Sequence, residues 1–94
     1  MKINTLTPLF CEFIPQDIQE GILYISEKFG IAIHLCACGC GKQSITPIYP
    51  YWKEGWTISN INDSITLRPS IGNFMGENPY HSHYFITENK IEWL

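Results

Sequence analysis

Seven consecutive positions, His34-Leu35-Cys36-Ala37-Cys38-Gly39-Cys40, carry three of the four cysteines and one of the three histidines of this chain. A second cluster, the histidine pair of His81-Ser82-His83, lies about forty residues downstream. Thiolates and imidazoles are the groups that bind zinc, and two ligand clusters separated along a chain are typical of a zinc site. The pattern therefore predicts a bound metal ion, Zn²⁺ first, that joins two distant segments.

The chain length of 94 residues predicts one domain, residues 1–94, with a modest core. A structural metal would compensate for that small core. The composition is that of a folded protein rather than a disordered one, with 45% hydrophobic and only 16% charged residues.

Charge and hydropathy exclude several classes of function. The net charge is -3 and there are only six Lys and Arg, so a nucleic-acid partner recognised through its phosphates is not expected. No apolar run approaches the roughly 20 residues that span a bilayer, and no signal sequence is visible, so we expect a cytoplasmic protein with no membrane contact. Cysteines stay reduced in that compartment, which favours metal ligation over disulfides.

Alternating apolar residues and turn signals predict a mainly β, small antiparallel domain with at most one short helix. Two-residue turns at Asn62-Asp63 and Glu88-Asn89 predict hairpins, and a third hairpin is expected across residues 27–30. The predicted strands are residues 8–14, 22–26, 31–35, 44–48, 56–61, 64–68, 84–87 and 90–93. Residues 15–20 are expected to form one or two helical turns, and residues 69–73 an irregular loop.

The cysteine segment is predicted to be a metal-binding turn, zinc-ribbon-like in arrangement. Glycine accepts positive φ, so Gly39 and Gly41 allow the backbone to wrap around an ion. The candidate ligands are Cys36, Cys38, Cys40, His81 and His83. His34 has three interpretations: a ligand, a hydrogen-bond donor to a thiolate, or a core histidine.

A catalytic metal is not indicated. Zinc deaminases need His-x-Glu followed by Pro-Cys-x-x-Cys, zinc proteases of one large class need His-Glu-x-x-His, and this chain has neither. A thiol nucleophile, Cys40 with His81 as its base, is the alternative.

The run Tyr49-Pro50-Tyr51-Trp52 is dense in aromatic residues. Such residues pack in the core of a β domain, or, if exposed, dominate protein–protein interfaces. Tyr49, Tyr51 and Trp52 are therefore the candidate interaction residues.

Linked motifs along the chain resemble a small bacterial family of unknown function. The similarity spans residues 15–93 and is carried by Gly21-Ile22-Leu23-Tyr24-Ile25-Ser26, His34-x-Cys36-Ala37-Cys38-Gly39-Cys40-Gly41, Ile65-Thr66-Leu67-x-Pro69-Ser70-Ile71-Gly72-Asn73, Ser82-His83-Tyr84-Phe85-Ile86 and Ile91-Glu92-Trp93. The resemblance implies zinc binding. Because some members are encoded beside ubiquitin-like conjugation genes, it also implies an accessory role with conjugation components as protein partners.

One position departs from the family pattern. The family carries a cysteine three residues before the His of Ser-His-Tyr, where this chain has Tyr80. His81, the next residue, is the expected substitute ligand.

These observations predict a non-catalytic zinc-binding accessory or adaptor module for protein–protein interaction in a bacterial ubiquitin-like conjugation pathway, with no catalytic residues. The alternative is a metal- or thiol-dependent enzyme that uses a cysteine of the Cys36–Cys40 cluster.

Overall fold

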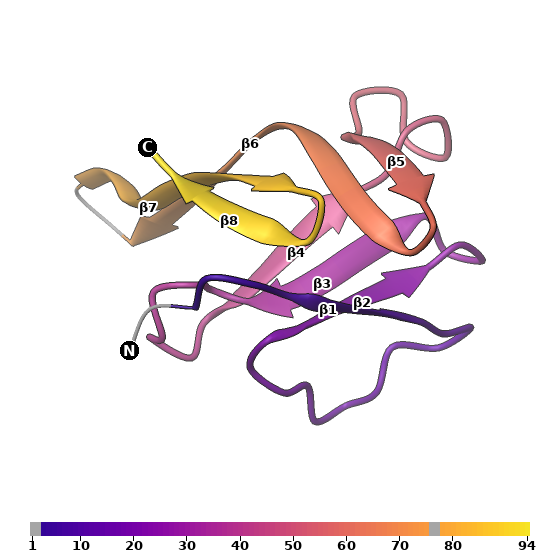
Figure 1. Ribbon diagram of the computed structural model, residues 1–94, viewed down its shortest axis with the longest axis horizontal. Helices are drawn as coiled ribbons and strands as arrows, with labels where there is room; N and C mark the ends of the chain where they lie inside the picture. Colours follow the sequence, from indigo (N-terminus) through magenta and orange to yellow (C-terminus); the bar gives the residue numbers. More distant parts are fainter. Residues whose placement is uncertain (1–2, 76–77) are drawn as a thin grey trace.

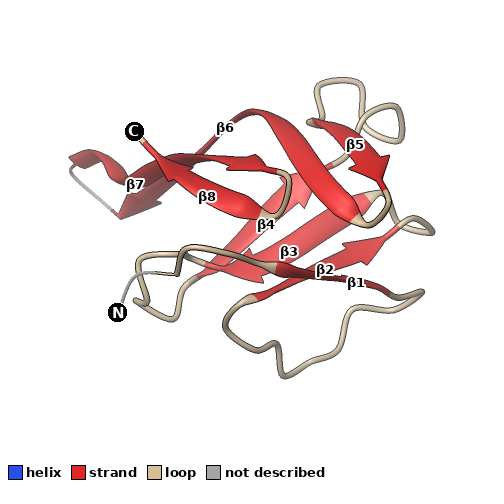
Figure 2. Ribbon diagram, in the orientation of Figure 1, coloured by secondary structure: helices blue, strands red, loops and turns tan. Residues whose placement is uncertain are grey.

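The computed structural model describes residues 3–75 and 78–94, and the side chains of these residues except those of 73–75 and 78–82. In this part of the chain, two four-stranded sheets lie against each other (Figure 1) and the remainder is loops and turns (Figure 2). The first sheet contains β1 (Thr7–Phe10), β2 (Ile22–Ser26), β3 (Ile31–Leu35) and β4 (Gln43–Pro47). The second contains β5 (Thr57–Ile61), β6 (Ser64–Met75), β7 (Asn78–Thr87) and β8 (Lys90–Trp93). The prediction of a mainly β fold is confirmed.

The strands follow sequence order in both sheets, β1-β2-β3-β4 and β5-β6-β7-β8. Every neighbouring pair is antiparallel except β1 and β2, which are parallel. A parallel pair needs a crossover connection, and residues 11–21 supply it. The antiparallel prediction therefore holds for all pairs but this one.

Two tight hairpin turns form where the sequence predicts them. Asn62 and Asp63 have φ of 52° and 65°, and Glu88 and Asn89 have φ of 47° and 67°. Positive φ at both central residues matches the twist of the flanking strands. The Asn89 side chain also joins the two turns, since its Oδ1 accepts the Ile65 N–H at 2.8 Å and its Nδ2 donates to Asp63 O at 2.9 Å.

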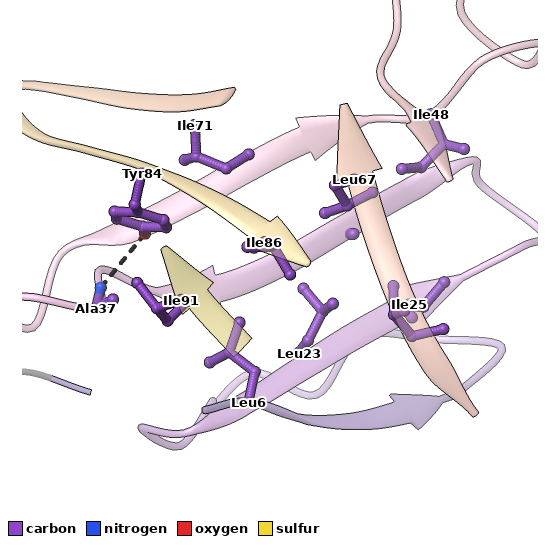
Figure 3. Packing of buried hydrophobic residues seen from close by; sticks show 12 residues of the cluster. Leu6, Leu23, Ile25, Ala37, Ile48, Leu67, Ile71, Tyr84, Ile86 and Ile91 are labelled. Carbon is purple, nitrogen blue, oxygen red and sulfur yellow. Dashed lines mark hydrogen bonds between the residues drawn. The ribbon is translucent and has the colours of Figure 1, made fainter. Parts of the chain in front are cut away.

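The core lies between the two sheets and follows the two-residue period of the strands. Leu23 and Ile25 of β2 belong to one cluster with Ile65 and Leu67 of β6, and all four residues are at most 2% exposed. Figure 3 shows Leu23, Ile25 and Leu67 in this cluster. Tyr84 and Ile86 of β7 belong to the same cluster and are fully buried. Because alternate residues point inward, the residues between them project from the outer face of the second sheet.

Two local predictions are wrong. Residues 15–20 form bends and no helix, because the long crossover between β1 and β2 occupies this stretch. Residues 69–73 are not an irregular loop but part of β6, where Ile71 pairs with Tyr84 and Gly72 with His83. Pro69 suggested an interruption, but a strand tolerates proline at a bulge, and β6 has one there.

No helix that could cross a membrane occurs in the described ranges 3–75 and 78–94.

Candidate functional site

A bulge in β6 shapes the outer face of the second sheet. Leu67 pairs with Ile86 and Ile71 pairs with Tyr84, so residues 68–70 of β6 lie opposite Phe85 alone. Bulges bend a strand and redirect side chains, and they occur often beside active sites. Here the extra residues include Ser70, which stands between the buried Leu67 and Ile71 and is itself only partly covered.

Ser70 and His83 form a hydrogen-bonded pair across this bulge. The Ser70 Oγ lies 2.6 Å from the Nε2 of His83, which projects from β7 beside the inward-pointing Tyr84. The Trp56 indole Nε1 donates to the backbone oxygen of Ser70 at 3.3 Å and so fixes the bulge from the β5 side. A serine hydroxyl within hydrogen-bond reach of an imidazole is the arrangement that activates a serine nucleophile.

The three clustered cysteines meet in one turn. Their sulfur atoms all lie within 4.8 Å of one another, and the Cys36 and Cys38 sulfurs are 3.3 Å apart. Gly39 and Gly41, with φ of 88° and 83°, bend the backbone around them as predicted. Tetrahedral zinc with bonds of about 2.3 Å would separate two thiolates by about 3.8 Å. The turn can therefore hold a metal ion with little rearrangement.

Cys38 is poorly suited to nucleophilic catalysis. Burial, together with the side-chain hydrogen bonds to Cys36 and Cys40, raises the pKa of the Cys38 thiol to about 11. A neutral thiol is a weak nucleophile, whereas a neighbouring cation would favour the thiolate.

His34 lies in the core rather than at the surface of the turn. It is fully buried, and its Nε2 is 2.7 Å from the hydroxyl oxygen of Tyr84. Its Nδ1 is buried and has no hydrogen-bond partner among the described residues. Desolvation lowers the pKa of His34 to about 4, so the ring is neutral at neutral pH. The same Tyr84 hydroxyl accepts the Ala37 N–H at 3.4 Å, which connects the cysteine turn to β7 (Figure 3).

The predicted ligands are only partly brought together. Within the described side chains, the one group that could hold a metal consists of Cys36, Cys38 and Cys40, without His34 or His83. His83 lies instead beside Ser70. The His81 side chain is outside the described residues, so a four-ligand zinc site remains a prediction.

The predicted interaction residues lie at the surface. Tyr49, Tyr51 and Trp52 are 52%, 57% and 52% exposed, so they do not pack in the core. Partner binding by these three side chains remains a prediction.

The sequence alone does not indicate Ser70 as a candidate site residue. The pattern Pro69-Ser70-Ile71-Gly72-Asn73 was noted for its family resemblance, and His83 for its imidazole, but no local spacing connects a serine to a histidine thirteen positions later. The β6–β7 pairing supplies that connection. The chain has six serines, and nothing in the sequence selects Ser70 among them without this pairing.

Comparison with known proteins identifies the family. Residues 10–94 match the family described as "Bacterial ubiquitination-like system serine protease (BubE)", and the chain belongs to it. No curated protein and no solved structure matches the chain. The predicted membership of a small bacterial family tied to ubiquitin-like systems is thereby confirmed.

The family description overturns the functional prediction. A family of serine proteases is enzymatic, so the expected non-catalytic adaptor is wrong, and so is the alternative of an enzyme that uses a cysteine of the Cys36–Cys40 cluster. The error arose because three adjacent thiols dominate the sequence, whereas Ser70 and His83 meet only in the folded sheet.

Proposed function

We propose that this member of the serine protease family hydrolyses peptide bonds with Ser70 as the nucleophile and His83 as the general base. The observation that carries the proposal is the 2.6 Å separation of Ser70 Oγ and His83 Nε2 on the outer face of the second sheet. The family description places such proteases in a bacterial ubiquitination-like system, so we infer that the substrate is a protein of that system.

The chemistry of this pair is acyl transfer. The Ser70 Oγ attacks the carbonyl carbon of the cleaved bond while the Nε2 of His83 takes the hydroxyl proton. His83 then gives the proton to the leaving amine, and an ester forms between Ser70 and the acyl part of the substrate. A water molecule, deprotonated by the same imidazole, hydrolyses the ester and regenerates the hydroxyl.

The fold fixes the β7 backbone that carries the His83 imidazole. Tyr84, the neighbour of His83, is fully buried and its hydroxyl is bonded to His34 and Ala37. At the edge of the sheet, the Leu94 N–H donates to the backbone oxygen of His83 at 3.0 Å. The β7 backbone at His83 is therefore anchored on both sides.

We propose further that the cysteine turn holds a structural zinc ion through Cys36, Cys38 and Cys40, with His81 as the fourth ligand. Three sulfur atoms within 4.8 Å of one another support this. Zinc would supply no step of the peptide hydrolysis. It would balance the charge of the thiolates and order the turn. The Ala37–Tyr84 hydrogen bond connects this turn to β7, the strand that contains His83.

The test uses a fluorophosphonate, which reacts with activated serines. The purified protein is treated with the reagent, and the modified residue is located by mass spectrometry after digestion. We expect a single adduct on Ser70, and its rate of formation should fall at least about a hundredfold in Ser70→Ala and His83→Ala. Ser59→Ala, which changes an exposed serine of β5, is the matched control and should react like the parent protein.

The same samples distinguish a catalytic role of His83 from a metal-binding role. If His83 serves as the base, His83→Ala keeps the metal content of the parent protein while losing the Ser70 adduct. No adduct on Ser70 of the parent, or labelling that survives His83→Ala, would overturn the proposed function.

A further inference from the structure

Arg68, the first residue of the β6 bulge, is held rigidly beside the candidate active site. Its Nη1 donates to Leu67 O at 2.8 Å and to Ile86 O at 3.2 Å. Its Nη2 donates to Thr87 Oγ1 at 2.8 Å, and its Cζ lies 4.6 Å from the centre of the Phe85 ring. A long side chain that is normally mobile is thus fixed in one place, which removes much of the entropy cost of binding a ligand.

No carboxylate of residues 3–72 or 83–94, whose side chains the structure describes, forms an ion pair with this guanidinium. In the described part of the chain, the one ion pair within 4.0 Å joins Lys28 and Glu12, far along the sequence from Arg68. Glu92 pairs with Phe85 from the β8 side and shares the outer face, but it makes no ion pair with Arg68. Arg68 therefore presents a fixed, exposed positive charge.

The free donors of Arg68 suit a carboxylate. A guanidinium has five N–H groups, and among the described side chains the three hydrogen bonds above leave the Nε–H and one N–H of Nη2. These two neighbouring donors match the two oxygens of a carboxylate in a bidentate contact, the strongest kind of pair that arginine makes.

The spacing of residues along β7 gives an estimate of the distance between the Arg68 guanidinium and the bond to be cleaved. His83 and Phe85 are two residues apart on the same face of β7, which is about 6.6 Å along the strand. Arg68 lies over Phe85 and its Nη2 reaches Thr87 Oγ1, so its guanidinium is at least one such step from the Ser70–His83 pair. In an extended peptide whose reacting carbonyl is at Ser70, the residue two positions away lies at about this distance.

We propose that Arg68 is a carboxylate-binding subsite of this active site, which selects substrates with a carboxylate about two residues from the cleaved bond. The inference rests on the proposed function. Two sources supply that chemistry: the side chain of a substrate Asp or Glu, or the carboxyl terminus of a substrate from which a short tail is removed.

The first experiment measures selectivity during cleavage. A peptide library is digested with the protein, the cleavage sites are identified by mass spectrometry, and cleaved sequences are compared in pairs of Glu with Gln. A second series compares a free terminal carboxylate with its amide two residues beyond the bond. We expect about a tenfold preference for the carboxylate in one of the two series, and the series that shows it identifies the source.

Variants of Arg68 show whether the guanidinium is responsible. Arg68→Gln should abolish the preference, Arg68→Lys should retain part of it, and Arg68→Glu should favour Lys-containing peptides instead. Lys90→Gln removes an equal charge from an exposed position on β8 and is the matched control, which should keep the parent's preference. Equal cleavage of Glu and Gln peptides and of acid and amide peptides by the parent protein would refute the subsite.

The second experiment does not depend on turnover. The Ser70→Ala protein is titrated with the peptide acetyl-Gly-Glu-Gly-amide, its Gln counterpart, acetyl-Gly-Gly-Gly as the free acid, and the amide of that peptide. NMR follows the Nε–H signal of Arg68. A shift with the carboxylate peptides and not with their neutral counterparts supports the subsite, even if Ser70 proves unreactive and the proposed function fails. Equal responses refute the subsite, even if Ser70 is labelled by the fluorophosphonate.

Discussion

Replacing Tyr84 by Phe removes one oxygen atom from the centre of the protein. Tyr84 is fully buried, and its hydroxyl lies 2.7 Å from His34 Nε2 and 3.4 Å from the Ala37 nitrogen. His34 is itself fully buried, and in the described part of the chain its Nδ1 has no hydrogen-bond partner. In Tyr84→Phe, neither ring nitrogen of His34 would have a partner, although one of them must carry a proton.

The cost follows from these contacts. A buried polar group left without a partner destabilises a protein by about 1–3 kcal/mol, and the long contact to Ala37 adds little, so we expect a loss of about 2 kcal/mol in the free energy of unfolding. For a chain of this size, that loss corresponds to a fall of about 10 °C in the melting temperature. Urea unfolding followed by circular dichroism measures the free energy directly.

Two controls make the result specific. Tyr51→Phe removes the same atom from a side chain that is 57% exposed, and should change stability by less than about 0.5 kcal/mol. Adding His34→Leu to Tyr84→Phe removes the unpaired imidazole, so the double variant should be more stable than the sum of the two single changes predicts. A Tyr84→Phe protein within about 0.5 kcal/mol of the parent would refute the reasoning, since the buried imidazole would then have no need of the hydroxyl.

Two further predictions concern the turns. Cys38→Ser should lower the metal content measured by elemental analysis and the melting temperature together, because the binding free energy of a structural metal is folding free energy; an unchanged melting temperature would show that the thiol has no structural role. Asn89→Gly keeps the positive φ of the hairpin but loses the side-chain hydrogen bonds to Ile65 and Asp63, and should cost about 1–2 kcal/mol in urea unfolding. Asn62→Gly in the neighbouring turn is the control for the second prediction and should lower the free energy of unfolding by less. An equal loss in the two variants would show that the conformation of the hairpin turn, and not the side-chain hydrogen bonds of Asn89, dominates.

Local sequence determined much of the β architecture. Period-two patterns such as Ile65 and Leu67 set the buried face of a strand, because side chains alternate across a sheet. The turns at Asn62-Asp63 and Glu88-Asn89 set the register of their hairpins, because few residues tolerate two successive positive φ values. The cysteine cluster was also predictable, since its three thiols lie within five residues and need only a tight turn to meet.

The candidate active site depends on the tertiary structure. Ser70 lies in a stretch whose proline suggested a loop, and it becomes part of β6 only because β7 pairs with it across a bulge. His83 was predicted to bind metal together with the cysteines, but the same pairing places it against Ser70. Arg68 reaches Phe85 and Thr87 of β7 for the same reason. Contacts between residues far apart in the chain depend on which strands pair and in which register, and the core between the two sheets determines both.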